Sequence, residues 1–209
     1  MHPNPAFRKE TDARNIAFAR TRGFGVLALS TEVAPLLSHV PFLLAEDGTW
    51  ADLHLVRSNP IVGALKQPLT ARIAVSGPNS YVSPDWYGVV DQVPTWNYVA
   101  VHLTGVLERR PTEELRDVLD RQSAFYEDRL RPKPPWVTAK MNEEALARMM
   151  RMIVPCRFRV DDIQGTWKLN QNKPDEVRLR AADQIGAHGF GSELSELQNL
   201  MQAVKEGEN

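Results

Sequence analysis

The segment from His54 to Pro60, which reads HLVRSNP, joins the end of an apolar strand to the start of a helix. Proline is favoured at the first position of a helix, and the side chain of Asn59 can cap the amides that are free there. A guanidinium, a hydroxyl and a carboxamide therefore meet a helix start at Arg57, Ser58 and Asn59. Because the planar donors of arginine bind two oxygens at once, this junction is predicted to bind an anion.

A second interpretation of the same residues needs no ligand. Arg57 would form an ion pair at the surface, and Asn59 would serve only as the helix cap. His54, on the strand that leads into the junction, belongs to the same neighbourhood. The residues alone leave both interpretations open.

Apolar runs on both sides of this segment predict a mainly β protein with some helix, an α+β fold. Turn formers fill 76–80 and 83–85, so an irregular loop is expected from there to Pro94. Strands are expected over 24–29, 36–44, 50–56, 69–75, 95–107 and 154–163. Helices are expected over 7–22 and 59–65, from Thr112 through Tyr126, around Leu146 to Ile153, and near the C-terminus at Leu194 to Val204.

Composition narrows the class of protein. The chain has 209 residues, and 25 Lys and Arg against 26 Asp and Glu give a formal charge of −1, so direct DNA binding is not expected. The single Cys156 cannot form an internal disulfide. Neither an apolar leader at the first residues nor a run of about 20 apolar residues is present, so we expect a cytoplasmic protein that does not enter the membrane.

The sequence lacks the motifs of several common catalytic and metal sites. The chain has no Gly-x-x-x-x-Gly-Lys loop, no pair of cysteines and no His-Glu-x-x-His motif, which argues against nucleotide hydrolysis and zinc chemistry. Its five histidines show no metal-ligand spacing, and no metal is expected. His39 and His102, within predicted strands, are each first interpreted as structural groups.

Aromatic and carboxamide side chains gather in three segments: 81–87 (YVSPDWY), 94–98 (PTWNY) and 167–172 (WKLNQN). A flat aromatic ligand needs apolar and aromatic faces with a few polar groups at its edge, and this composition can supply them. Tryptophan and tyrosine also pack in cores and at interfaces without any ligand. The clusters by themselves do not decide between a binding site for a flat ligand and packing in a core or an interface.

In this order the segments resemble the PaiB family of FMN-binding proteins, over about residues 1 to 175. The motifs that carry the resemblance are SHVP at 38–41, HLVRSNP at 54–60, GP at 77–78 with YVSPDWY at 81–87, PTWNY at 94–98 with VH at 101–102, and WKL at 167–169 with QN at 171–172. The resemblance implies a split β-barrel of the pyridoxamine-phosphate-oxidase type with peripheral helices. Residues 176–209 would follow as a helical tail, packed on its own or on a partner subunit.

The resemblance also implies a cofactor and its site. Arg57, Ser58 and Asn59, with His54, would hold the phosphate of FMN. The ring system would lie in a cleft between the two subunits of a homodimer, lined by Trp96, Asn97, His102, Lys168 and Gln171. Three residues depart from the family pattern: His2 where Tyr is usual, Thr166 where Lys is usual and Asn170 where Ser is usual.

Three functions remain open at this point. The family is described as negative transcriptional regulators, which implies a flavin- or redox-linked regulator, with or without enzymatic activity. An FMN-dependent oxidoreductase is the enzymatic alternative, with His102 or Tyr98 as the proton donor. Haem binding is the third, since related split barrels bind haem; His39, His54 and His102 would be the candidate ligands.

Overall fold

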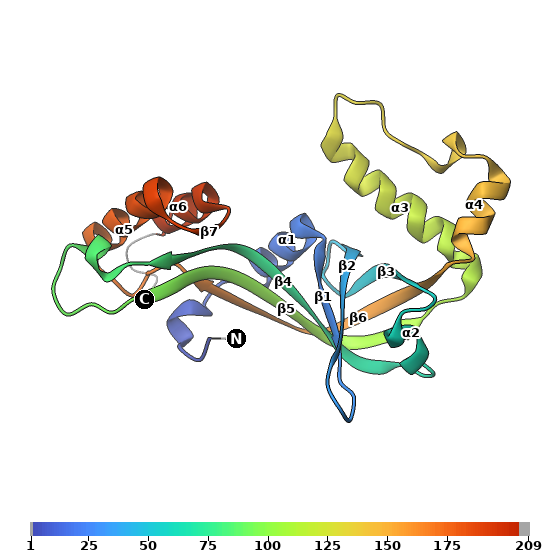
Figure 1. Ribbon diagram of the computed structural model, residues 1–209, viewed down its shortest axis with the longest axis horizontal. Coiled ribbons are helices and arrows are strands. Elements are labelled where there is room, and N and C mark those ends of the chain that lie inside the picture. Colours follow the sequence, from blue (N-terminus) through green and yellow to red (C-terminus); the bar gives the residue numbers. More distant parts are fainter. Residues whose placement is uncertain (1, 205–209) are drawn as a thin grey trace. The chain divides into compact units, whose positions relative to one another are not determined.

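The computed structural model describes residues 2–204 and contains one seven-stranded antiparallel sheet (Figure 1). Its strands are β1 (Phe24–Leu29), β2 (Leu36–Leu44), β3 (Trp50–Val56), β4 (Leu69–Val82), β5 (Thr95–Arg109), β6 (Ile153–Lys168) and β7 (Gly191–Ser192). Its α-helices are α1 (Asp12–Arg22), α2 (Pro60–Ala64), α3 (Leu115–Glu127), α4 (Glu143–Met150), α5 (Asp175–His188) and α6 (Leu194–Gln202).

Six of these strands close into a barrel. The strand order is β1-β2-β3-β6-β5-β4-β7, and β1 pairs with β4 as well as with β2. Along β1 buried and more exposed residues alternate, as expected of a strand with one face toward a core. Large side chains with no measurable exposure fill the interior, among them Leu27, Phe42, Leu53, Ile73, Leu103 and Phe158.

The chain divides into two compact units. We call the first the barrel unit; it comprises Ile16–Ala74 and Leu103–Ile163. The second, the terminal unit, comprises the chain up to Asn15, Val75–His102 and the chain from Gln164 onward. Strands β4, β5 and β6 run through both units. The predicted domain boundary near residue 175 stays a prediction.

In the barrel unit, α3 contacts β2 and β3. Its side chains are fixed by polar contacts as well as by apolar packing. Arg121 of α3 donates to the buried Asp52 of β3 at 2.6 Å, and Arg157 of β6 donates to the same carboxylate at 2.7 Å. The hydroxyl of Tyr126 donates to the carbonyls of Gly23 and Phe42, which joins the helix to the first two strands.

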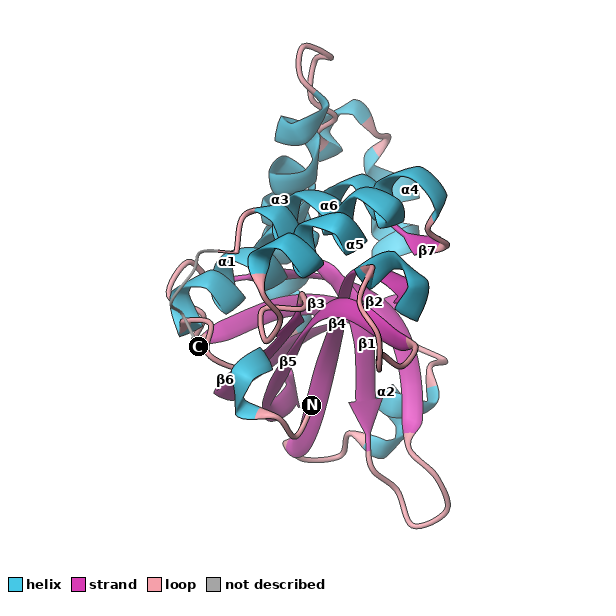
Figure 2. Ribbon diagram, turned by 90° about the vertical axis from the view of Figure 1, so that its left-hand side faces the viewer, coloured by secondary structure: helices cyan, strands magenta, loops and turns pink. Residues whose placement is uncertain are grey.

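In the terminal unit, α5 and α6 lie side by side (Figures 1 and 2). Ile185 of α5 and Leu197 and Met201 of α6 are fully buried. The buried guanidinium of Arg178 donates to the carbonyl of Met201 and, at 2.5 Å, to Asp175. The helical C-terminal segment therefore packs on its own chain within this unit.

The structure confirms the predicted strands 24–29, 36–44 and 50–56 and corrects several other expectations. The first α-helix begins at Asp12 rather than at residue 7. Helix α4 ends at Met150, so that Ile153 begins β6 rather than ending a helix, and β6 extends to Lys168. The predicted irregular segment at 76–80 is wrong, because β4 continues to Val82. Residues 71–74 of β4 pair with β1, and residues 79–80 pair with β7. Pro78 lies between these two stretches. Its missing N–H therefore removes no hydrogen bond from either pairing, and the strand tolerates it.

The helices of the structure are short. The longest that it describes, α5, has 14 residues, and α3 has 13. A helix needs about 20 apolar residues to cross a bilayer. Within residues 2–204 no helix is long and apolar enough to do so.

Candidate functional site

The junction after β3 lies in the barrel unit and has the predicted local structure. Asn59 caps α2, since its Oδ1 accepts from the amide of Ile61 at 2.9 Å, while its Nδ2 donates to Ser38 Oγ at 3.0 Å. Helix α2 has only five residues, so its dipole is a minor contribution to anion binding. Ser58 is exposed beside the cap.

Arg57 is exposed, and two of its three guanidinium nitrogens donate hydrogen bonds within its own chain. Its Nε donates to the carbonyl of Arg151 at 2.8 Å, and its Nη2 donates to that of Ile153 at 3.2 Å. These contacts fix the guanidinium against the turn between α4 and β6. Its Nη1 has no hydrogen-bond partner among residues 2–204, so this edge of a positioned cation is available to a phosphate oxygen.

His54 faces α3 rather than the junction. It is half-buried, and its Nδ1 and the Nε2 of Gln122 are buried without a hydrogen-bond partner in the part of the chain that the structure describes. Burial lowers the pKa of His54, and the neighbouring Gln122 side chain partly opposes this shift. A neutral imidazole in contact with a helix adds little to the attraction of a phosphate.

A second group of predicted residues lies in the terminal unit, on the half of β5 from Thr95 to His102. Side chains alternate along it: Asn97, Val99 and Val101 are buried, and Trp96, Tyr98, Ala100 and His102 are on the other face. The second face forms part of a cavity of about 430 Å³, which we call the His102 cavity. Its lining consists of His2, Pro3, Tyr98, Ala100, His102 and Thr166.

The structure brings two of the departures from the family pattern together in this cavity. The backbone amide of His2 donates to Thr166 Oγ1 at 3.3 Å, across 164 positions of sequence. Burial lowers the pKa of His2, and the nearby ammonium of Lys168 lowers it further. A neutral imidazole from the N-terminal segment and a hydroxyl thus share this part of the cavity.

Asn97 does not share a face with His102. Its side chain has no measurable exposure, and its Nδ2 contacts the sulfur of Met201 in α6 at 3.4 Å. Its Oδ1 has no partner among the described residues. Because side chains alternate along a strand, Asn97 lies on the helix-covered side of β5, and its predicted contact with a ring stays a prediction.

Trp96 belongs to an exposed aromatic cluster with Tyr81 and Phe190. The rings of Tyr81 and Phe190 stack at 5.5 Å, and Trp96 meets Phe190 edge to face at 5.7 Å. The indole Nε1 of Trp96 donates to Asn79 Oδ1 at 3.2 Å. Such a cluster offers an apolar surface of the kind that a flat ring system covers.

Lys168 lines a neighbouring cavity of about 300 Å³, which we call the Lys168 pocket. Its ammonium donates to Thr95 Oγ1 and lies 5.8 Å from the ring of Phe7. Burial lowers the pKa of Lys168, and the nearby Lys173 lowers it further. Since His2 lines both this pocket and the His102 cavity, the two adjoin within the terminal unit.

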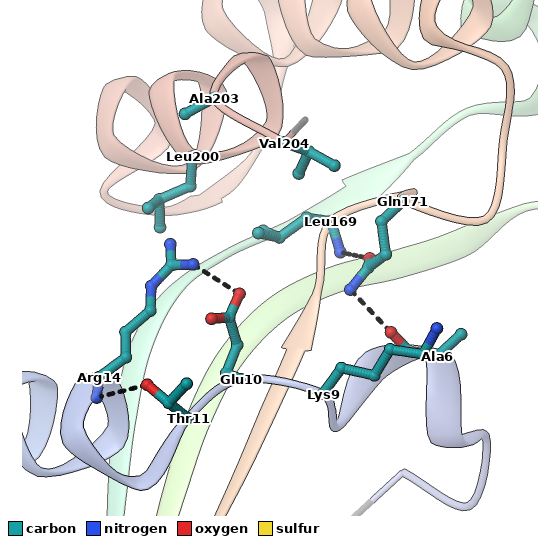
Figure 3. Close-up of a pocket in the computed structure, with 10 residues that line it drawn as sticks. All are labelled: Ala6, Lys9, Glu10, Thr11, Arg14, Leu169, Gln171, Leu200, Ala203 and Val204. Carbon is teal, nitrogen blue, oxygen red and sulfur yellow. Dashed lines mark hydrogen bonds and ion pairs between the residues drawn. The ribbon is translucent and has the colours of Figure 1, made fainter. Parts of the chain in front are cut away.

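Gln171 lies at a different cavity, of about 380 Å³, shown in Figure 3. Its Nε2 donates to the carbonyls of Ala6 and Trp167, and its Oε1 accepts from the amide of Leu169. Both ends of the carboxamide are therefore used within the chain. The structure shows Gln171 joining the N-terminal segment to the end of β6, and its predicted contact with a cofactor stays a prediction.

The residues present suit an anionic, aromatic cofactor such as FMN. The His102 cavity and the Lys168 pocket together offer two imidazoles, two ammonium groups, two tyrosines and the hydroxyls of two threonines, which can bind the edge of a ring system. Arg57 keeps one free edge for a phosphate. The sequence analysis did not single out Lys173, Tyr87 and Thr95, which line the Lys168 pocket. Tyr87 and Thr95 lie within the aromatic segments 81–87 and 94–98, and Lys173 follows the carboxamides at 170–172.

Comparison with known protein families agrees with this chemistry. Residues 1–162 match the model of a family described as "Putative FMN-binding domain". The "Protease synthase and sporulation protein PAI 2" of Bacillus subtilis (strain 168) is 28% identical over 184 residues, which make up 87% of this chain and 87% of that protein. An uncharacterized protein of Aspergillus fumigatus is 26% identical and covers 74% of this chain and 78% of its own length.

Solved structures confirm the split-barrel fold. The FAD and heme binding protein from Mycobacterium smegmatis superimposes with a TM-score of 0.58 at 15% identity, over 88% of this chain and 81% of that chain. The flavocytochrome Anf3 from Azotobacter vinelandii superimposes with a TM-score of 0.52 at 13% identity, over 80% of this chain and 72% of that chain. At these identities the likeness concerns the fold alone.

Proposed function

The chain belongs to the PaiB family of FMN-binding proteins, whose cofactor is FMN, and we propose that it is a homodimeric FMN-dependent oxidoreductase. The observation that carries the proposal is the His102 cavity, where titratable and hydroxyl side chains line an open face of β5. FMN supplies hydride or electron transfer, and the protein supplies binding, orientation and protons. His102 is the proposed proton donor, with Tyr98 on the same face.

The phosphate is proposed to bind at the junction after β3. Arg57 would donate through its free Nη1, Ser58 through its hydroxyl, and Asn59 would keep the junction in shape as the cap of α2. The ring system would lie on the face that carries Trp96 and His102, with the cofactor at the interface between two subunits. His54, Asn97, Lys168 and Gln171 complete the set of residues expected near it.

A second copy of this chain is the proposed partner, because the barrel presents an apolar outer surface. The register places Phe24 opposite Pro41, Val26 opposite His39 and Ala28 opposite Leu37, all on the outer face of β1 and β2. Phe24 is 53% exposed and Leu37 64% exposed. An apolar surface of this kind is typical of a protein–protein interface.

Substitution of Arg57 tests the phosphate site. We expect Arg57→Met to weaken FMN binding by about tenfold or more, the loss of one charge-assisted contact. Binding of riboflavin, which has no phosphate, would change little. Arg131→Met is the matched control, since Arg131 is an exposed arginine that pairs with Asp128. Equal losses for FMN and riboflavin would contradict the assignment.

Haem binding is the alternative with a specific observation in its favour, because His2 and His102 line one cavity. The absorbance spectrum of the purified protein separates the two: flavin bands support the proposal, and a Soret band supports haem. A regulator that contacts DNA directly would need tight, salt-sensitive binding in a mobility-shift assay, and the net charge of −1 argues against it.

A further inference from the structure

The Lys168 pocket holds two cations without a carboxylate partner. Among residues 2–204, no carboxylate lies within 4.0 Å of the ammonium of Lys168 or of Lys173. Lys168 donates to the hydroxyl of Thr95, and Lys173 donates to the carboxamide oxygen of Gln92. Both partners are neutral, so no ion pair within the described part of the chain compensates the positive charge of these two lysines.

A turn of the chain keeps the two lysines close together. Residues 170–173 follow β6, and the amide of Lys173 donates to the carbonyl of Asn170 at 2.9 Å. Asn170 adopts a left-handed backbone conformation, with a φ of 62°. The ammonium of Lys173 lies 4.2 Å from the centre of the Tyr87 ring, a cation–π contact that positions this charge in the pocket.

A buried donor in the same pocket lacks an acceptor. Asn170 is 2% exposed, and its Oδ1 accepts from the hydroxyl of Tyr87 at 3.4 Å. With the oxygen so used, its Nδ2 is left buried and without a partner among the described residues. A buried N–H without a hydrogen bond is destabilising, and an anion in the pocket would accept that hydrogen bond.

We propose that the Lys168 pocket binds the anionic group, a carboxylate or a phosphate, of the substrate. Lys168 and Lys173 supply the charge, and the Nδ2 of Asn170 supplies an oriented donor. Asp91 is the one carboxylate in the lining, and its side chain is exposed. The anion site follows from these contacts alone, whereas its assignment to a substrate beside the flavin rests on the proposed function.

The anion site is tested with flavin-free protein and inorganic phosphate, by calorimetry or by NMR. We expect saturable binding that Lys173→Met and Asn170→Asp each weaken by about tenfold or more. Aspartate suits the left-handed position and keeps the size of the side chain. Lys66→Met, which removes an exposed lysine of the barrel unit, should leave the affinity unchanged. Absence of saturable binding, or equal affinity in all variants, would overturn the site.

The source of the anion is tested by adding FMN. If the pocket binds the substrate, phosphate should bind to the FMN-loaded protein as tightly as to the flavin-free protein. Lys173→Met should then leave the ratio of the affinity for FMN to the affinity for riboflavin unchanged. Competition between phosphate and FMN would overturn the substrate assignment, because the flavin phosphate itself would then occupy the pocket. Failure of the protein to bind FMN at all would overturn the proposed function and leave the phosphate result intact.

Discussion

His54 carries the pH dependence that the structure predicts most directly. Burial lowers its pKa below the ordinary value of 6.5, so the unfolded chain takes up the proton first as the pH falls. The free energy of unfolding therefore decreases as the pH drops through 6.5, and levels off below the pKa of the folded state. We expect His54→Gln to reduce this decrease in urea unfolding between pH 7.5 and 5.5. An equal decrease in both proteins would show that other groups are responsible.

Cys156 is expected to be chemically inert in the folded protein. Burial raises the pKa of its thiol to about 12, and the side chain has no measurable exposure. The thiolate is the reactive form, so a thiol reagent at pH 8 should modify the protein only after unfolding. Rapid modification under native conditions would contradict this placement in β6.

Single residues of the pocket show why part of the site escaped sequence analysis. The contact between Tyr87 and Asn170 joins positions 83 residues apart, and His2 and Thr166 meet across 164 residues. No local pattern encodes such contacts. Asn59, by contrast, was correctly predicted as a helix cap, because its partner Ile61 is two positions away.

At the scale of elements, the close approach of β5 and β6 depends on Gly105. A Cβ at this position would lie 1.9 Å from the carbonyl oxygen of Arg159, and neither strand can yield without breaking pairing. We expect Gly105→Ala to lower the free energy of unfolding by about 2 kcal/mol or more. Chemical denaturation measures this change.

Gly63→Ala is the matched control for that experiment. Gly63 lies in α2, and a Cβ there would have no neighbour within 4 Å. Alanine is the better helix former, so this variant should be as stable as the original or more stable by up to about 1 kcal/mol. Equal destabilisation by both variants would contradict the tight packing at Gly105.

Strands with a regular alternation of apolar residues were predictable from the sequence. Strands whose extent depends on pairing with other strands were not. In 24–29 and 50–56 the apolar pattern and the bounding turns determine the strand, because the same face is buried throughout. In β4 the turn formers at 76–80 suggest a loop, yet pairing with β7 and burial of Gly77 and Pro78 keep the segment extended. Tertiary pairing overrides local preference there.

For the whole molecule, the proposed dimer predicts a dependence on the outer surface of β1 and β2. Leu37→Glu should shift the protein from dimer to monomer in light scattering, since a charge would enter an apolar interface. Leu37 is 64% exposed, so the fold of the single chain should tolerate the change. The control is Val137→Glu, at a valine that is 48% exposed in the segment between α3 and α4.

Two results would contradict this interface. A monomeric original protein at micromolar concentration would mean that the FMN site does not draw residues from two copies. The same shift in Val137→Glu as in Leu37→Glu would mean that the two copies do not meet specifically through the apolar surface of β1 and β2.

The central claim is that this split barrel binds FMN, and titration of the flavin-free protein with FMN tests it most directly. Absorbance and flavin fluorescence should change until one FMN is bound per chain, and then remain constant. The bound flavin should show shifted bands, as expected of a ring system removed from water. A titration without saturation, in a protein that is folded by circular dichroism, would contradict the account.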